Sequence, residues 1–421
     1  MTKKRIQKNE QIYELTTLVA GKFSLQQVLD KLAQAAVRIT DVKACSIRLL
    51  DEETNELKMR STYGLSDEYR NKGVVSKNDA VIKAAFDGQA VVLDDMQRDE
   101  RVKYRAAAAK EGLRGQLTVA MQFRDKAIGV LRLYNPASGN FGEEDIAFGR
   151  AVASQCAVAI TNARLYSEAI EGRRVADQIR LGGIIQRRMI PEAAPRINGL
   201  DIAAAYIPCF DVGGDFYDFF KIDQECIAVA IADVIGKGVP AAIMMSMFRG
   251  AVRAYADSKL NRAGVAEMID KLNKMACSQC DDSEFITLFY AVIDAKQPSI
   301  TYCNCGHEPT MLLRNGQIAE LKTGGIVLGV GREAEYEIET RKLQDGDFLL
   351  FYTDGLIDAA DFEGEFWGRK RLMKCLKECP AGSCASIVDY ILGHRRRFTG
   401  LAKQIDDTSL IAVRVDKKRE A

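Results

Sequence analysis

Along the first 165 residues, the spacing of hydrophobic positions changes from a helical period to strand-like alternation. Apolar residues recur at helical spacing over 12–19 and 25–36, which predicts a helix in each stretch. From Cys45 to Leu49 apolar and polar residues alternate, and the polar turn at 52–56 that follows predicts a β-hairpin. Further expected elements are strands over 90–93, 116–123 and 127–134, and a helix that begins near 143 and continues past 166.

After Gly199 the pattern changes to short strands separated by helices. Helical spacing of apolar residues predicts helices over 240–255 and 262–275, and a final strand is expected after 405–410. Apolar runs of strand length predict further strands over 202–207, 227–234, 287–293, 299–304 and 347–352. Both halves mix helices with short strands, so the chain is expected to be an α+β protein.

The helix that begins near 143 is expected to extend toward Met189 and to end at Pro191. Two adjacent glycines, Gly182 and Gly183, weaken it by about 1 kcal/mol each relative to alanine. Two interpretations stay open: a surface helix with a loose end, or a dimerising signalling helix with a weak point. The second rests on a 4-3-4 spacing typical of a short coiled-coil seam, formed by Ala159, Ala163, Tyr166 and Ile170.

Length and composition narrow the class of protein. A chain of 421 residues is expected to form two domains, and a net charge of +1 gives no support to nucleic-acid binding. No export signal or membrane-spanning run is visible, and 11 scattered cysteines are typical of reduced thiols, so we expect a cytoplasmic protein with no membrane partner. A zinc site would need Cys277, Cys280, Cys303, Cys305 and His307, but their spacing matches no common zinc motif.

Four short segments place aspartates beside strand-like runs, most of them with glycine nearby: 212–218, 232–238, 353–355 and 405–410. Clustered carboxylates at the ends of apolar strands repel one another and lose solvation, which a bound cation would offset. Carboxylate oxygens are hard ligands that favour Mg²⁺ or Mn²⁺, and glycine lets the backbone turn sharply. A single Asp-Gly pair, however, is most often a plain turn.

Taken together, these segments resemble the bacterial sporulation-type (stage II protein E type) branch of the PPM metal-dependent serine/threonine phosphatases. The resemblance covers about 177–415. It includes supporting stretches at 184–191, 238–242, 304–307 and 325–329. It implies an α-β-β-α sandwich of two packed antiparallel sheets flanked by helices, with the metal ions at one edge. Departures from the family pattern, such as Ile357-Asp358 after the third segment and Cys305 before Gly306-His307, remove no metal ligand.

The resemblance also implies a metal site for two Mn²⁺ or Mg²⁺ ions, formed by Asp215, Asp233, Val234, Asp354 and Asp406. Asp233 would bridge the ions, and the carbonyl of Val234 would help to hold one of them. Asp354 and Asp406 would ligate the other ion, and Asp215 would hold metal-bound water or a second ion. Asp233 and Asp354 are the expected catalytic residues, with Asp407 and Asp218 in supporting positions.

The N-terminal part resembles a GAF domain, a small sensor module with a central antiparallel sheet. The stretches that carry this resemblance are 127–133, 141–145 and 152–166. Neither histidine lies before residue 166, which excludes a haem held by a histidine of this domain. Cys45 and Cys156 are too few thiolates for a four-cysteine iron–sulfur cluster. The ligand is unknown: a small molecule, a partner protein and no ligand at all stay open.

Two features outside the aspartate segments have alternative interpretations. His307 is a candidate general acid, although a structural hydrogen bond is the favoured role. The cluster Arg395-Arg396-Arg397 can hold an acidic or phosphorylated partner, although a solvated helix face is favoured.

We therefore expect a GAF sensor domain over 1–165, a helical linker over 166–192 and a phosphatase domain over 193–417. The resemblance implies a signal-regulated serine/threonine protein phosphatase whose substrate is a phosphorylated anti-sigma-factor antagonist in a partner-switching pathway. We expect a homodimer through the sensor domain and the linker helix. The alternative is a non-catalytic, phosphatase-like sensor or scaffold, whose hallmark would be loss of one of the four aspartates; all four are present.

Overall fold

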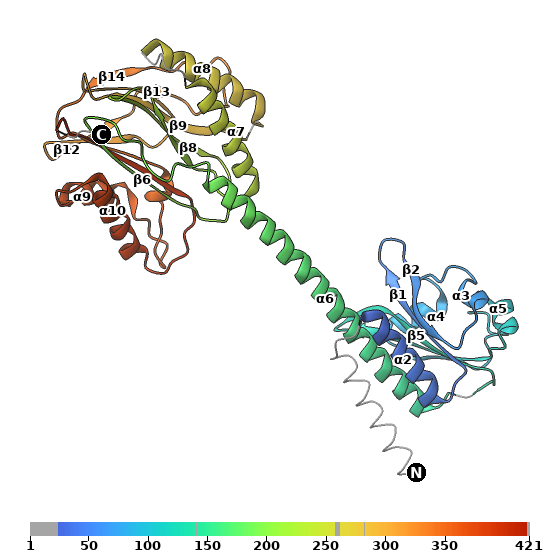
Figure 1. The fold of residues 1–421 in the computed structure, drawn as a ribbon. Coiled ribbons are helices and arrows are strands. Elements are labelled where there is room, and N and C mark those ends of the chain that lie inside the picture. Colours follow the sequence, from blue (N-terminus) through green and yellow to red (C-terminus); the bar gives the residue numbers. More distant parts are fainter. Residues whose placement is uncertain (1–23, 140, 257–261, 282, 419–421) are drawn as a thin grey trace. The chain divides into compact units, whose positions relative to one another are not determined.

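The computed structural model describes residues 24–139, 141–256, 262–281 and 283–418 (Figure 1). The chain divides into two compact units between Arg173 and Arg174. The helix expected over 12–19 lies outside the described residues. No helix among the described residues has an apolar run of the length that a lipid bilayer requires.

The N-terminal unit is built on an antiparallel sheet with strand order β2-β1-β5-β4-β3. The alternation from Cys45 to Leu49 lies in β1, and the hairpin expected after it is formed by β1 and β2. The strands are β1 (Ala44–Asp51), β2 (Glu56–Tyr63), β3 (Val91–Leu93), β4 (Gly115–Phe123) and β5 (Lys126–Asn135). The strand predictions for this unit are therefore confirmed.

Both faces of this sheet are covered. The apolar faces of α2 (Leu25–Thr40) and of the first part of α6 (Glu143–Arg187) bury residues such as Leu131 and Leu133 of β5. The opposite face, which carries Val130 and Tyr134, packs against α3 (Asp67–Arg70), α4 (Ala80–Phe86) and α5 (Arg105–Lys110). Alternate residues of each strand thus serve two different cores.

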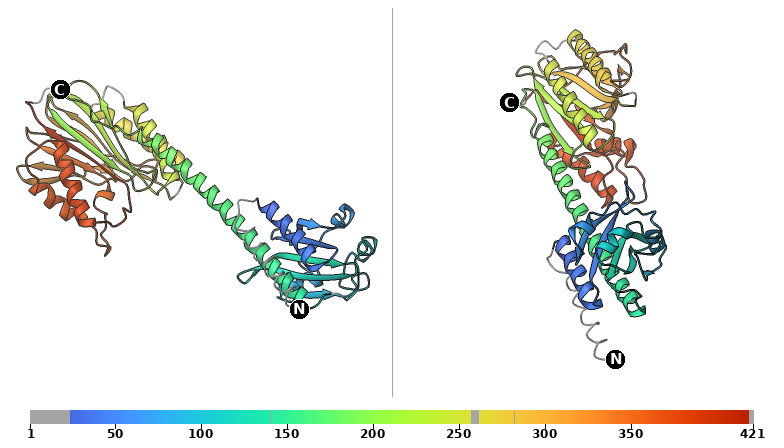
Figure 2. Two further views of the ribbon diagram at one scale, coloured as in Figure 1. Left: turned by 60° about the horizontal axis from the view of Figure 1, so that its bottom comes forward. Right: turned by 90° about the vertical axis from the view of Figure 1, so that its right-hand side faces the viewer.

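The C-terminal unit contains two sheets packed face to face (Figure 2). The first has strand order β13-β10-β9-β8-β7, with β14 paired to β10, and it is antiparallel except for the short parallel pair of β10 and β13. Its strands are β7 (Phe216–Lys221), β8 (Cys226–Val234), β9 (Ile286–Asp294), β10 (Ser299–Cys305), β13 (Gly324–Gly325) and β14 (Glu339–Lys342).

The second sheet has strand order β12-β11-β15-β16-β6. Phe289 of β9 meets Phe351 of β15 edge-to-face across the core, with ring centroids 5.5 Å apart. Cys303 and Cys305 are both buried, with their sulfur atoms 3.8 Å apart. The strands are β6 (Leu200–Ile207), β11 (Thr310–Arg314), β12 (Gln317–Leu321), β15 (Phe348–Tyr352) and β16 (Thr408–Val415).

Helices cover the outer face of each sheet. In Figure 2, α7 (Val239–Tyr255) and α8 (Arg262–Gln279) lie on one side of the sheets and α9 (Gly368–Glu378) and α10 (Cys384–Thr399) on the other. Residues of α8 join the core of the first sheet, and residues of α9 and α10 pack against β15 and β16. The α-β-β-α sandwich is therefore confirmed, with one parallel strand pair that the sequence analysis did not anticipate.

The glycine pair of the linker does not interrupt α6, which stays helical through both positions. The two glycines differ in their surroundings. Gly182 has open space around it, whereas a Cβ atom at Gly183 would overlap the backbone carbonyl of Asp211. Gly183 is thus a packing position, where α6 approaches the loop before β7 as closely as a backbone can.

Alanine at the two positions should have opposite effects on stability. Gly182→Ala should stabilise the C-terminal unit by up to about 1 kcal/mol, because alanine favours the helix and meets nothing. Gly183→Ala should destabilise it, because either α6 or the loop at Asp211 must move. Urea unfolding followed by the fluorescence of Trp367, the chain's one tryptophan, reports on this unit. Equal effects of the two substitutions would contradict the packing role.

Candidate active site

The sandwich brings the four predicted aspartate segments to the ends of neighbouring strands. Asp215 immediately precedes β7, and Asp233 lies near the end of β8, its antiparallel neighbour. Asp354 begins the short 3₁₀ helix η1 (Asp354–Leu356) after β15, and Asp406 precedes β16, the antiparallel neighbour of β15. Each sheet therefore contributes two carboxylates.

Asp215 and Asp233 interact directly. Each lies close enough to act on the pKa of the other carboxyl group. Burial, and then the charge of Asp233, raises the pKa of Asp215 well above its usual value. Burial also raises the pKa of Asp233 to about 7, with further contributions from the charges of Asp354 and Asp406.

In the second pair of aspartates, Asp354 and Asp406 have different surroundings. Burial raises the pKa of Asp354 to about 6, and the charges of Asp406 and Asp358 add to the effect. Asp406 forms an ion pair with Lys237, whose amino nitrogen lies 2.9 Å from the carboxylate. Lys237 follows Asp233 in the same segment, but the sequence analysis gave it no role. It is the cation that partly neutralises this cluster.

The chemistry of this donor set fits a hard divalent cation, because a cation would offset the burial and the mutual repulsion that raise these pKa values. The carbonyl of Val234 lies against Gly214, where a Cβ atom would come within 2.7 Å of its oxygen. Among the described residues, however, no three side chains of His, Cys, Asp or Glu are arranged to hold a metal ion. The ligand roles of Asp215, Asp233, Val234, Asp354 and Asp406 therefore stay predictions.

Asp407 holds the loop that carries Asp215. Its buried carboxylate accepts hydrogen bonds from the backbone N–H groups of Cys209, at 2.7 Å, and Gly214, at 2.8 Å. Thr353, directly before Asp354, donates a hydrogen bond of 2.6 Å to Asp215. Asp407 was expected in a supporting position, whereas the contribution of Thr353 was missed although it lies within a quoted segment.

The end of α6 clamps the same loop from the other side. The side-chain amide of Gln186 donates to the carbonyl of Gly213, at 2.8 Å, and its oxygen accepts from the N–H of Gly213, at 3.0 Å. Gln186 is buried, so both bonds are shielded from water. The linker helix is thus bonded two residues from Asp215, which sequence analysis alone did not show.

Asp218 was expected in a supporting position beside the metal site, but its partners are two arginines of α7. It is fully buried in β7 and forms ion pairs with Arg249, at 2.7 Å, and Arg253, at 3.0 Å, both on α7. It therefore fastens α7 to the first sheet rather than supporting the carboxylate cluster.

His307 is buried beside the site, with a structural hydrogen bond. Its Nδ1 lies 2.7 Å from the hydroxyl of Thr287, and its backbone N–H donates to the side chain of Asn304 at 2.7 Å. Burial lowers the pKa of His307 to about 3, so the imidazole stays neutral near pH 7. A neutral, buried ring favours the structural role over the general-acid role.

The basic cluster on α10 is not simply solvated. Arg395 is 8% exposed, and its Nε has no hydrogen-bond partner among the described residues. It lines a groove of about 370 Å³ together with Arg396, Lys403 and Gln404. Gln404 donates to the backbone carbonyl of Asp406, at 2.6 Å, so the groove borders one of the aspartate segments. The expectation of a solvated face is wrong for Arg395.

Comparison with known proteins agrees with this architecture. The family model "Stage II sporulation protein E (SpoIIE)" matches residues 223–416, and the GAF domain model matches residues 24–161. Phosphoserine phosphatase RsbU of Bacillus subtilis is 31% identical over 246 residues, which cover 58% of this chain and 71% of RsbU. The chain belongs to the SpoIIE-type family of protein phosphatases. Its C-terminal unit is a serine/threonine phosphatase domain of the PP2C type, and its N-terminal unit is a GAF domain.

Further similarities agree with membership of the SpoIIE-type family. Protein IcfG of Synechocystis sp. is 30% identical over 261 residues, which cover 56% of this chain but only 41% of IcfG. The SiaA-PP2C domain of Pseudomonas aeruginosa superposes with a TM-score of 0.52 at 20% identity, covering 59% of this chain and all of that domain. The structural similarity supports the fold, and this chain matches less than half the length of IcfG.

The buried His307 should make the C-terminal unit less stable in mild acid. Its folded-state pKa of about 3 lies below the unfolded value of about 6.5, so the unfolded chain binds the proton first. The free energy of unfolding should therefore fall as the pH drops below about 6.5, by up to about 1.4 kcal/mol per pH unit from this group. His307→Gln should lose this slope in urea unfolding between pH 7 and 5, followed by Trp367 fluorescence.

The matched control is His394→Gln, which removes the other histidine without touching the hydrogen bond to Thr287. Parallel pH profiles for the wild type and His307→Gln would show that His307 is not buried and neutral.

Proposed function

We propose that this chain is a signal-regulated phosphatase that uses two Mn²⁺ or Mg²⁺ ions to hydrolyse phosphoserine or phosphothreonine on a protein in the cytoplasm. The observation that carries the proposal is the gathering of Asp215, Asp233, Asp354 and Asp406 at the ends of paired strands, with raised pKa values for the first three. Carboxylates held together at such electrostatic cost favour a cation-binding role over a purely structural one.

In this proposal, Asp233 and Asp354 hold the ions, helped by Asp215, Asp406 and the carbonyl of Val234. When bound, such ions supply positive charge that lowers the pKa of water and offsets the charge growing on the phosphoryl oxygens. The surrounding residues keep the carboxylates in place. Asp407, Thr353 and Gln186 fix the Asp215 loop by hydrogen bonds, and Lys237 orients Asp406.

The substrate class follows from the family and from the groove beside the site. RsbU is named a phosphoserine phosphatase, and we propose the same chemistry here, on a phosphorylated anti-sigma-factor antagonist of a partner-switching pathway. The groove lined by Arg395, Arg396 and Lys403 supports this proposal, because guanidinium and ammonium groups bind acidic or phosphorylated segments. The alternative of a non-catalytic scaffold requires no such cluster of strained carboxylates.

We further propose a regulatory arrangement of a GAF sensor over 1–165, a linker over 166–192 and a phosphatase domain over 193–417. The bonds of Gln186 to Gly213 support the idea that α6 sets the position of the Asp215 loop. A homodimer through the GAF domain and α6 is supported by exposed apolar side chains along the helix: Leu165, Tyr166, Ile170, Val175 and Leu181. Our candidate for the two-state element is the segment at Gly182 and Gly183.

Removing either expected catalytic aspartate should abolish metal-dependent hydrolysis. Asp233→Asn and Asp354→Asn each keep the side-chain shape but remove a charged ligand, so the rate with Mn²⁺ should fall by about 100-fold or more. The measurement is release of phosphate from a phosphoserine peptide, with and without Mn²⁺. Asp270→Asn, on the exposed face of α8, is the control and should keep the wild-type rate. Wild-type turnover by both site variants would reject the proposal.

Loss of the clamp on the Asp215 loop should weaken metal-dependent activity without removing a ligand. Gln186→Leu leaves the buried N–H and C=O of Gly213 unpaired and frees the loop, so half-maximal activity should need about 10–100-fold more Mn²⁺. Ile185→Ala, at the neighbouring exposed position, is the matched control. An unchanged Mn²⁺ titration for Gln186→Leu would show that α6 does not set the loop.

A further inference from the structure

The GAF domain buries an unusual set of polar side chains on one face of its sheet. Arg132 of β5 lies between Ser46 of β1 and Thr118 of β4 in the strand register. This face is the one that carries Val130 and Tyr134, under α3, α4 and α5. The buried polar side chains of these strands are Ser46, Arg48, Gln116, Thr118 and Arg132. Two of them are cationic and none is acidic, so this face of the sheet is positively charged.

Several donors on this face lack a partner. Arg48 is 4% exposed and donates through Nη1 to the carbonyl of Leu57, at 2.9 Å, but its Nε and Nη2 are unpaired among the described residues. Arg132 is 8% exposed, and its Nε also has no hydrogen-bond partner among the described residues. The buried amino group of Lys72 makes no hydrogen bond within the described part of the chain and lies 3.3 Å from the ring centroid of Tyr69. Such donors are costly unless an acceptor meets them.

The nearby carboxylates are engaged elsewhere. Asp79 accepts a hydrogen bond from the N–H of Ser76, and Glu111 accepts one from the N–H of Ser66, at 2.8 Å. Arg101, at the edge of the pocket, is paired with Asp99 at 2.7 Å. The pKa of Lys72 is lowered to about 6, first by burial and then by the charges of Arg132 and Arg48, with Glu111 opposing. The Lys72 amine is therefore largely neutral near pH 7 unless an anion enters the pocket and offsets the arginine charges.

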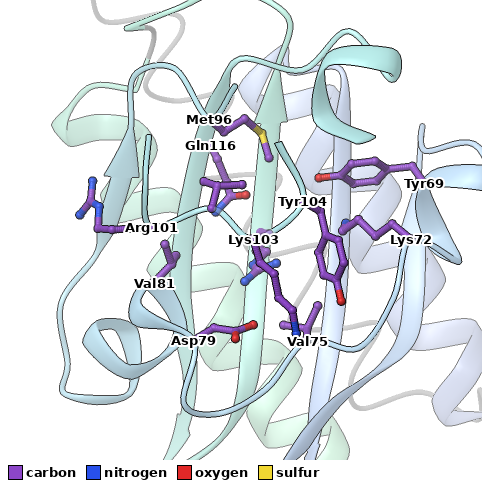
Figure 3. A pocket seen from close by; sticks show the side chains of 12 residues that line it. Tyr69, Lys72, Val75, Asp79, Val81, Met96, Arg101, Lys103, Tyr104 and Gln116 are labelled. Atoms are coloured by element: carbon purple, nitrogen blue, oxygen red, sulfur yellow. The ribbon is translucent and has the colours of Figure 1, made fainter. Parts of the chain in front are cut away.

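Two of these basic side chains, Lys72 and Arg132, border a small cavity, in which Figure 3 labels Lys72. Its volume is about 30 Å³, more than the 10–15 Å³ or so that one water needs. Lys72 and Arg132 line it together with Gln116, Tyr69 and Tyr104, and Figure 3 shows Lys72 beside the two tyrosine rings. A space of this size excludes a nucleotide or a planar cofactor and accepts a ligand of only a few heavy atoms.

We propose that this cavity, the basic pocket, binds a small oxyanion, with Arg132 and Lys72 donating to its oxygens and Arg48 adding positive charge from the sheet. Guanidinium groups form strong, directional hydrogen bonds to carboxylate and phosphate oxygens. Burial of Arg132 and of the Lys72 amino group away from water strengthens these contacts. A short carboxylate and inorganic phosphate share the required chemistry, and the size of the pocket admits both.

The test uses the full chain with EDTA and compares sodium formate and sodium phosphate with sodium chloride at constant ionic strength. Hydrogen exchange of peptides covering 66–75 and 101–114 is followed by mass spectrometry as each anion is titrated. Saturable protection of these peptides by formate, phosphate or both is expected, and it identifies which source of oxyanion the pocket prefers. Protection by neither anion beyond chloride would overturn the proposal.

Two pocket variants and one control assign the effect to named residues. Lys72→Met and Arg132→Gln should each weaken the anion effect at least tenfold. Lys126→Gln, on the same strand as Arg132 but exposed and paired with Glu52, should leave it unchanged. Phosphate bound at the phosphatase domain would instead protect peptides around Asp215 and Asp406 and would not respond to the pocket variants. Wild-type affinity in both pocket variants would contradict the proposal. Lys72→Met leaves the sheet untouched, so it still tests the pocket if Arg132→Gln misfolds.

Discussion

Repulsion between buried carboxylates is the constraint around which the C-terminal unit is organised. Asp215, Asp233 and Asp354 have raised pKa values because burial and neighbouring charges disfavour their ionised forms. The fold keeps them together through groups that lie outside the cluster. Asp407 ties the Asp215 loop to the start of β16, and Lys237 supplies a positive charge to Asp406. The structure thus holds an unfavourable charge arrangement in place by hydrogen bonds from two sheets and one helix, as is common where function requires it.

Much of the fold could be predicted from periodicity, because long elements leave a clear pattern. The strands at β4, β5, β8 and β9 and the long helix α6 were all anticipated. Elements without such a pattern were missed. The strand β7 has the sequence FYDFFK and buries side chains on both faces, so it shows no alternation. The helices α3 and α5 have only 4 and 6 residues, too few to establish a helical period.

For the site, the sequence predicted which residues take part but not which residues they contact. The aspartates were found because each lies near a strand-like run, most of them with glycine nearby, and because the four segments together resemble a known family. Their contacts were not, since Asp407 and Gly214 are 193 residues apart in the chain. Asp218 is part of the same motif as Asp215, yet its partners Arg249 and Arg253 lie on a helix and turn it into a structural anchor. For the buried cations of the GAF domain, the only sequence signal was the alternation of β1. A charged side chain on a strand is unusual only if it is buried, and its burial is known only from the structure.

The continuity of α6 places a limit on how its length can change. Each residue of an α-helix advances the chain by about 1.5 Å and turns it by about 100°. The apolar stripe formed by Tyr166 and Ile170, four residues apart, and the amide of Gln186 belong to one helix, so an insertion between them rotates one relative to the other. Adding one residue would move the stripe by more than a quarter turn, whereas adding seven would nearly restore its phase, with a drift of about 20°. A change in length keeps the phase of the helix only when it adds or removes close to a whole number of turns, as seven residues do.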